Sequence, residues 1–361
     1  MFSDQIIKPT LVISEEKVVN NLERMFRKAA GSKAVLRPHF KTHQSHKIGN
    51  LFRKKGIDKI TVSSVGMAEH FVADGWNDIT IAFVVNLRET GRINDLAAKV
   101  TLNVLVDSLF TAKVLSGSIK HDLNVFIKTD TGYHRTGLLP ESTAIPEIIE
   151  VIENSANLNF AGFLTHAGHT YHAKGKAETL AIMEDAGKKL LKLKQQYVRQ
   201  FPDIIVSYGD TPSCSMADDC SGFDEIRPGN FVYYDVMQYH LGSCTLDEIA
   251  VTTACPVVSV FPEREEIVIY GGAVHLSKES IEADNGFRLY GYLVNYKESG
   301  WSDPVPGAYV SALSQEHGIV KVPKKYIGSF KPGDLVGILP VHSCLTADLL
   351  KGRVKILNKD F

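Results

Sequence analysis

Lys41 is the residue best suited to nucleophilic chemistry in this sequence. It lies in the segment RPHFKTH, residues 37–43, at the end of an apolar run. A lysine amine attacks an aldehyde only when it is deprotonated, and nearby cations and exclusion from water lower its pKa. Arg37, His39 and His43 are its polar or cationic neighbours in the chain. We therefore interpret Lys41 as the candidate nucleophile, with a solvated loop lysine as the alternative.

Two later segments have the composition of a phosphate site. They are GDTPS at residues 209–213 and RPGN at residues 227–230. Glycines let backbone N–H groups approach phosphate oxygens, and Ser and Thr hydroxyls donate hydrogen bonds to them. Each segment taken alone is also an ordinary turn, because Gly, Pro, Asp and Ser are turn residues.

His342 and Cys344 form a candidate metal site. They follow the apolar run LVGILPV, and on a continued strand they would face the same side. An imidazole and a thiolate suit zinc, and two ligands leave positions open for water or substrate. His166, His169 and His172 are candidates for a third ligand. A buried cysteine beside a hydrogen-bonded histidine is the alternative.

The elements expected around these residues alternate between strands and helices. Helical patterns such as residues 177–201, with one apolar stripe, separate eight runs that are rich in Val, Ile, Phe and Thr. This alternation predicts an α/β fold, a (β/α)8 barrel. A doubly wound sheet is the rival, but no GxGxxG segment follows the first strand. The predicted strands are 34–40, 59–65, 78–85, 101–107, 123–130, 159–166, 203–209 and 223–235.

Titratable, hydroxyl and glycine residues follow five of these eight strands. Active residues of a barrel come from the carboxyl ends of its strands, so this common position indicates one functional site. The segments concerned are 37–43, 128–137, 165–171, 208–213 and 225–230.

The pattern changes after about Tyr239. Residues 249–274 are typical of a hairpin with its turn at 262–265, and five short strand-like runs follow without a long helical pattern. We expect a barrel over residues 1–238 and a C-terminal all-β domain over residues 239–361, with the first fifteen or so residues packed on that β domain.

Composition excludes several classes of protein. The net charge of −1 gives no electrostatic case for nucleic acid or anionic lipid. No apolar run reaches the roughly 18 residues of a membrane helix, and the first ten residues lack signal-peptide features. The five cysteines are odd in number and irregularly spaced, which favours buried thiols and a cytoplasmic location.

Together these segments resemble the D-serine dehydratase and D-threonine aldolase family of fold-type III pyridoxal-phosphate enzymes. The resemblance runs through the chain, and the segments at 37–43 and 342–344 are its most specific motifs. It implies a barrel of the alanine racemase type followed by a β domain. It further implies a homodimer with shared active sites, pyridoxal 5'-phosphate as cofactor, and a divalent metal, with zinc favoured over manganese or magnesium.

The same resemblance assigns roles to individual residues. Lys41 matches the lysine that forms the Schiff base with the cofactor, and Arg135 matches the arginine at the cofactor's phenolic oxygen. His342 and Cys344 match the metal ligands. The cofactor and phosphate neighbourhood is matched by His166, Tyr171, Thr211, Ser213, Gly229 and Asn230.

The implied reaction is β-elimination from a small D-3-hydroxy amino acid, giving a keto acid and ammonia. Lys41 would remove the Cα proton, and the metal would make the β-hydroxyl a better leaving group. His-x-Cys at residues 342–344 is the dehydratase pattern, whereas aldolases of the family tend to carry His-x-Asp. Aldolase cleavage to glycine and an aldehyde is the close alternative, and a racemase or a non-catalytic cofactor carrier fits less well.

Overall fold

The computed structural model describes residues 5–282 and 286–358. The chain divides into two compact units. One is Arg24–Gly229, and the other combines the chain up to Glu23 with the chain from Asn230 onward. The sequence analysis placed the division between residues 238 and 239, nine residues later in the chain.

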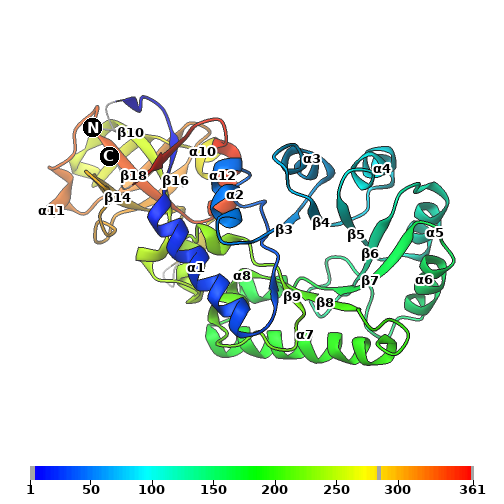
Figure 1. Cartoon of the computed structure of the whole chain (residues 1–361). Helices are drawn as coiled ribbons and strands as arrows, with labels where there is room; N and C mark the ends of the chain where they lie inside the picture. Colours follow the sequence, from blue (N-terminus) through cyan, green and yellow to red (C-terminus); the bar gives the residue numbers. More distant parts are fainter. Residues whose placement is uncertain (1–4, 283–285, 359–361) are drawn as a thin grey trace. The chain divides into compact units, whose positions relative to one another are not determined.

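Eight parallel strands form the sheet of Arg24–Gly229, in the order β2-β9-β8-β7-β6-β5-β4-β3 (Figure 1). The two end strands meet at a bridge between His39 and Thr61, where Thr61 N–H donates to Pro38 O at 2.9 Å. The predicted (β/α)8 barrel is confirmed. The strands are β2 (Val35–Leu36), β3 (Lys59–Val62), β4 (Asp78–Val84), β5 (Thr101–Val106), β6 (Leu123–Lys128), β7 (Leu158–Leu164), β8 (Ile205–Tyr208) and β9 (Glu225–Ile226).

Helices follow the strands and bury one apolar face each. In α7 (Lys176–Tyr197), Met183, Ala186, Leu190 and Leu193 of the predicted stripe are buried. The other α-helices are α1 (Glu15–Gly31), α2 (His46–Arg53), α3 (Val65–Ala73), α4 (Thr90–Ala97), α5 (Leu109–Ser118), α6 (Ala144–Glu153) and α8 (Thr211–Met216). Residues 15–23 of α1 belong to the other unit. Two short 3-10 helices are η2 (Leu87–Glu89) and η3 (Gly168–His172).

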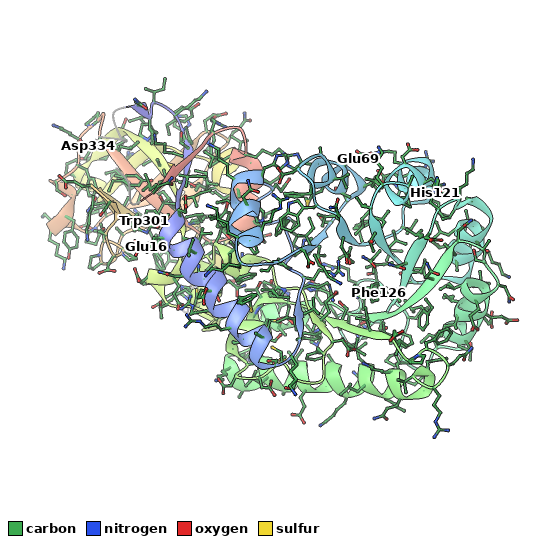
Figure 2. All side chains as sticks on the ribbon, in the orientation of Figure 1. Glu16, Glu69, His121, Phe126, Trp301 and Asp334 are labelled. Atoms are coloured by element: carbon green, nitrogen blue, oxygen red, sulfur yellow. The ribbon has the colours of Figure 1, made fainter. Side chains whose placement is uncertain are left out.

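Strand β6 shows how the barrel interior is built. Asn124, Phe126 and Lys128 alternate along it and therefore share one face. Phe126, labelled in Figure 2, is buried with Leu105 and Leu164 of the neighbouring strands. The interior thus changes along the strand from an amide through an aromatic ring to a lysine at the carboxyl end.

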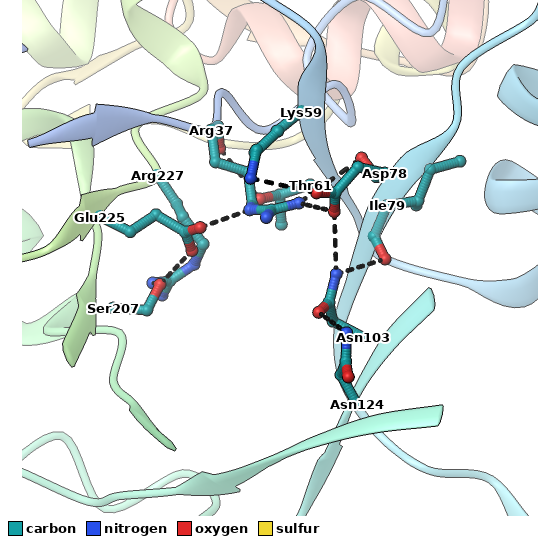
Figure 3. Close-up of polar contacts among 10 residues, drawn as sticks. All are labelled: Arg37, Lys59, Thr61, Asp78, Ile79, Asn103, Asn124, Ser207, Glu225 and Arg227. Carbon is teal, nitrogen blue, oxygen red and sulfur yellow. Dashed lines mark hydrogen bonds and ion pairs between the residues drawn. The ribbon is translucent and has the colours of Figure 1, made fainter. Parts of the chain in front are cut away.

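A polar network joins strands on both sides of the barrel's closure (Figure 3). The buried Arg37 guanidinium binds the carboxylates of Glu225 and Asp78, the latter at 2.6 Å. Ser207 Oγ donates to Glu225 at 2.5 Å. On the other side, Asn103 donates to Asp78 at 3.1 Å. Because β2 has only two ladder residues, these ion pairs add closure that backbone pairing alone does not give.

The second unit is built on a nine-stranded sheet, which confirms the predicted C-terminal β domain. Strands β10 (Val251–Phe261) and β11 (Glu266–Tyr270) form the predicted hairpin, with Phe261 opposite Glu266. The remaining strands are β12 (Ile281–Glu282), β13 (Arg288–Leu289), β14 (Gly291–Lys297), β15 (Gly300–Trp301), β16 (Tyr309–Leu313), β17 (His317–Lys321), β18 (Leu335–Pro340) and β19 (Val354–Leu357). Of these, β12 and β13 pair only with each other.

Short helices complete this unit. They are η4 (Asn230–Val232), α9 (Val236–Leu241), η5 (Leu246–Glu248), η6 (Pro262–Arg264), α10 (Ala273–Leu276), α11 (Lys324–Ile327) and α12 (Ser343–Leu350). The chain's first strand, β1 (Thr10–Ser14), also belongs here, because it pairs with β10 on one side and β19 on the other.

Candidate functional site

Lys41 lies in a turn, two residues beyond the bridge that closes the barrel. Its side chain is exposed on the described chain, and its backbone N–H donates to Nδ1 of His39 at 3.3 Å. Of its expected neighbours, only His39 stays beside it. Arg37 is held by two carboxylates in the barrel interior. His43 is packed against Phe40 and Phe52 in an aromatic cluster.

His39 and His166 are both neutral, but their Nε2 atoms differ. Nε2 of His39 can donate a hydrogen bond, whereas Nε2 of His166 can accept one. Burial, with the nearby Lys41 charge second, lowers the pKa of His39 well below its usual range. Since its Nδ1 accepts from an N–H, its proton is on Nε2. Burial likewise lowers the pKa of His166 to about 3. His166 Nδ1 lies 2.6 Å from the Gly209 carbonyl oxygen, which can only accept, so Nδ1 carries the proton. The unprotonated Nε2 of His166 can therefore accept a hydrogen bond.

Positive charge gathers at this end of the barrel. Lys128 and Arg227 are buried, and Arg135 is exposed. Burial and the charges of Arg227 and Arg135 lower the pKa of Lys128 to about 7. Lys41, Arg135 and Lys128 all act electrostatically on His166, which places these cations in one neighbourhood. Asp130 and Asp107 offset part of that charge, and an anionic ligand would offset more.

The two expected phosphate segments have a different local structure from the one predicted. Residues 209–213 are the start of α8, with Asp210 as its N-cap. Residues 227–230 lie beyond β9, which ends at Ile226, so the expected strand over 223–235 is wrong for most of its length. Pro228 explains the early end, because it has no N–H for the sheet ladder.

Glycine brings these segments close to the Lys41 turn. A Cβ on Gly229 would lie 2.8 Å from the His39 carbonyl oxygen and 3.2 Å from Thr42 Oγ1. The Gly229 N–H donates to Thr211 Oγ1 at 3.3 Å. The segments after β2, β8 and β9 therefore converge, as the common position of their polar residues predicted.

Ser213 lies in the first turn of α8 and binds the N-cap residue Asp210. Its N–H donates to Asp210 Oδ1 at 2.7 Å, and its hydroxyl lies within hydrogen-bond distance of both Asp210 oxygens. Tyr208 Oη donates to the same carboxylate at 2.6 Å. Burial raises the pKa of Asp210, so each of these donors stabilises a costly buried charge. The side chain of Ser213 is committed to Asp210 and holds the first turn of α8.

Tyr171 lies in η3, half-buried, with its ring centroid 6.4 Å from that of His166. It therefore shares a neighbourhood with one of the other expected cofactor residues. Asn230 is buried in the second unit, where Nδ2 lies 2.7 Å from Asp235 and 3.4 Å from Cys344 Sγ. Its side chain thus belongs to the surroundings of the candidate metal pair.

The expectation that His342 and Cys344 lie on one strand is wrong. Strand β18 ends at Pro340, His342 is the extended N-cap of α12, and Cys344 lies in the first helical turn. The change occurs because the Ser343 N–H at the helix start donates to the buried Asp235 carboxylate at 2.9 Å. The two side chains still meet. Burial lowers the pKa of His342, but hydrogen bonding to Cys344 and the charges of Cys344 and Asp235 raise it on balance, to about 9.

A third metal ligand does not emerge from the described ranges. Across residues 5–282 and 286–358, no group of three or more His, Cys, Asp and Glu side chains is arranged to hold an ion. His166 is occupied through Nδ1 by Gly209, and His169 and His172 lie in η3. None of the five cysteines forms a disulfide, and four of them are buried. No helix of the described chain is long and apolar enough to span a bilayer.

Sequence reasoning gave no individual role to three buried residues near these sites: Lys128 and Asp210, which lie in segments that it singled out, and Asp235, which it did not consider. Alternation along β6 would have found Lys128, since it continues the inward face of Asn124 and Phe126. Asp210 and Asp235 each precede a short helix and act as N-caps. That capping pattern is readable in sequence, but their burial is not.

Comparison with known proteins agrees with this architecture. Residues 13–236 match the family described as alanine racemase, N-terminal domain, and residues 250–354 match a serine dehydratase domain. The chain is 29% identical to D-serine dehydratase of Dictyostelium discoideum, over 98% of this chain and 93% of that protein. It is 26% identical to D-threo-3-hydroxyaspartate dehydratase of Delftia sp. (strain HT23), covering 94% and 91%.

The fold also resembles solved structures. A metal-free form of D-threo-3-hydroxyaspartate dehydratase superimposes with a TM-score of 0.90 at 24% identity, covering 99% of this chain and 96% of that one. D-threonine aldolase from Filomicrobium marinum gives 0.77 at 20% identity, with coverage of 95% and 91%. The fold and these matches define the class, that of the fold-type III pyridoxal-phosphate lyases. Within that class, the chain belongs to the alanine racemase N-terminal domain family, in the branch that carries a serine dehydratase domain.

Proposed function

We propose that this protein is a pyridoxal-phosphate- and metal-dependent dehydratase of small D-3-hydroxy amino acids. Its products would be a keto acid and ammonia. The observation that carries the proposal is the exposed Lys41 at the carboxyl end of the barrel, beside neutral histidines and several cations. The two dehydratases named above support elimination, and the Cys344 thiol beside His342 supports a metal.

The barrel residues fit the phosphorylated cofactor. An aldehyde needs an accessible amine, which Lys41 offers, and a phosphate needs positive charge and N–H donors. Arg135, Lys128 and Arg227 bring the charge, and the segments around Thr211 and Gly229 bring backbone groups near the Lys41 turn. Bound there, the cofactor supplies an electron sink for charge that develops at the substrate Cα.

Protein groups would carry the proton transfers. Lys41 Nζ would take the proton from Cα, since it is the amine nearest the expected aldehyde. His39 can donate from Nε2, and His166 can accept at Nε2, so the two offer complementary contacts to bound polar groups. Arg135 would hold the phenolic oxygen of the cofactor. Because both histidines stay neutral, they add no further positive charge around Lys41.

His342 and Cys344 fit a divalent cation as a pair. His342 Nδ1 is buried and has no hydrogen-bond partner among the described residues, and the thiol beside it is a soft ligand. We propose zinc, with manganese or magnesium as alternatives. The ion would supply a Lewis acid for the departing β-hydroxyl. Remaining coordination positions would be open to substrate.

We further propose a symmetric homodimer with shared active sites. Light scattering at micromolar concentration should give twice the chain's 39.8 kDa. A fully active monomer would contradict this.

Product identification tests the function. The purified protein, loaded with pyridoxal phosphate and zinc, is incubated separately with D-serine, D-threonine and D-threo-3-hydroxyaspartate. Keto acid and ammonia in equal amounts are expected, with L-serine and the Lys41→Ala protein as controls. A chelator should suppress the reaction. Glycine and an aldehyde would show an aldolase instead, and conversion of D-serine to L-serine would show a racemase.

A further inference from the structure

Tyr133 occupies a position that the proposed reaction does not use. It follows Gly132 in the loop after β6, and its ring packs directly on Gly168 in the loop after β7. A Cβ at Gly168 would lie 2.6 Å from Cζ and 2.8 Å from Cδ1 of that ring. Glycine is therefore required at residue 168 for the Tyr133 ring to lie where it does.

Two histidines flank the same ring. The His166 ring meets it edge to face at 5.8 Å between centroids, and the His169 ring stacks on it at 6.2 Å. Tyr133 thus connects the β6 loop to His166, whose Nδ1 is held by Gly209 of the β8 loop. Three strand ends are linked through one aromatic side chain.

The loop then folds an arginine back over the ring. Asp130 Oδ1 accepts from the N–H groups of Gly132 at 2.9 Å and His134 at 3.1 Å. This holds His134 at a φ of 56°, in the left-handed region that a non-glycine residue enters only at a cost. The turn brings the Arg135 guanidinium to 5.2 Å from the Tyr133 ring centroid.

Arg135 is exposed, so little else on the described chain limits its many rotamers. A cation is attracted to the face of an aromatic ring at this distance. We propose that Tyr133 is a positioning residue: its ring, seated on Gly168 between His166 and His169, holds the Arg135 guanidinium in place for the cofactor's phenolic oxygen. This inference rests on the proposed function of the site.

A double-mutant cycle in the cofactor-loaded enzyme tests the coupling. Tyr133→Leu should lower kcat about tenfold in the wild-type background, with KM less affected, because a fixed cation is lost. In an Arg135→Gln background, Tyr133→Leu should lower kcat by less than about twofold, because the guanidinium that Tyr133 holds is already absent. Tyr133→Phe keeps the ring and should restore most of the rate lost in Tyr133→Leu.

The visible absorbance of the bound cofactor gives a second measurement, which a general loss of protein stability would not change. The pH midpoint of the bound cofactor's visible band should shift in Arg135→Gln, and in the same direction in Tyr133→Leu, because each weakens a cation at the phenolic oxygen. Gly168→Ala, which displaces the ring without removing it, should give the same shift and serves if Tyr133→Leu folds poorly.

The outcomes distinguish a failure of the positioning role of Tyr133 from a failure of the proposed function. Equal rate losses in both backgrounds, or an unshifted band in both Tyr133→Leu and Gly168→Ala, would overturn the role of Tyr133 alone. A wild-type protein that takes up no pyridoxal phosphate would overturn the proposed function, and this inference with it.

Discussion

Arg37 and Asp78 are joined at 2.6 Å across the place where the barrel closes, and Glu225 holds the other side of the same guanidinium. Burial opposes the charge, yet the two carboxylates raise the pKa of Arg37 on balance. Closure of the sheet therefore depends on a buried ion pair network as well as on the bridge at His39.

Replacing Arg37 by Met should destabilise the protein severely. The change removes the guanidinium that Asp78 and the buried Glu225 share, and breaking a buried pair costs about 3–5 kcal/mol. Asp78 keeps its ion pair with Lys59 at 3.4 Å, so most of the loss should come from Glu225. Urea unfolding followed by circular dichroism measures the loss. Arg92→Met is the matched control, because Arg92 pairs with Glu69 at the surface, where water and salt screen the interaction. Similar losses in both variants would contradict the closing role.

Lys41→Ala should abolish the visible absorbance of the lysine-bound cofactor and reduce activity to background. Lys128 is the informative competitor, since its pKa of about 7 leaves part of its amine deprotonated at neutral pH. Borohydride reduction of the wild-type holoenzyme, followed by peptide mass spectrometry, identifies the modified residue. We expect the label on Lys41. A label on Lys128 would show that the assignment is wrong.

Either His342→Ala or Cys344→Ala should release most of the bound metal, because a single protein ligand binds the ion too weakly. Cofactor absorbance should persist, since Lys41 belongs to the other unit. Dehydration of D-serine should collapse, while exchange of the Cα proton survives in part. Cys244→Ala is the control, as Cys244 is a buried thiol on another segment. Metal analysis and NMR in D2O give the two readouts. If dehydration of D-serine continues in the presence of a chelator, His342 and Cys344 have a structural role and not a catalytic one.

Acidification should weaken the fold through His43. Burial lowers the pKa of His43 to about 3, whereas an unfolded histidine titrates near 6.5. The unfolded chain therefore binds a proton that the folded chain excludes, so stability is fully present above about pH 6.5 and falls as the pH drops towards 3. At pH 5 the loss is about 2 kcal/mol for this residue.

The pH slope of the free energy of unfolding checks that expectation. His43→Asn keeps an acceptor for the Ser45 N–H, to which His43 Nδ1 binds at 3.1 Å, but removes the titrating group. Its stability between pH 7.5 and 5 should fall less steeply than that of the wild type. Identical slopes would show that other groups dominate.

The order of strands and helices was predictable because it depends on local periodicity. The run 101–107 and the observed β5 differ by one residue, and the stripe on α7 follows directly from its apolar spacing. The predicted length of β9 was wrong because Pro228 and Gly229 interrupt a segment whose apolar residues are typical of a strand on both sides.

The site was predictable as a list of strand ends and less so as contacts. No feature of the local sequence shows that the Arg37 side chain points into the barrel, whereas His39 lies beside Lys41. Strand extrapolation also failed at His342, because a carboxylate more than a hundred residues away caps the helix that starts there. Such long-range partners are fixed by the tertiary fold and leave no periodic signal.

Strand β1 has a consequence for the order in which the protein can form during synthesis. It lies between β10 and β19, with Leu11 paired to Val354 almost at the other end of the chain. Residue 354 must therefore leave the ribosome before that pairing exists, and by then every strand of Arg24–Gly229 has already emerged. The barrel can assemble early, whereas β1 is made before it and must wait for β19.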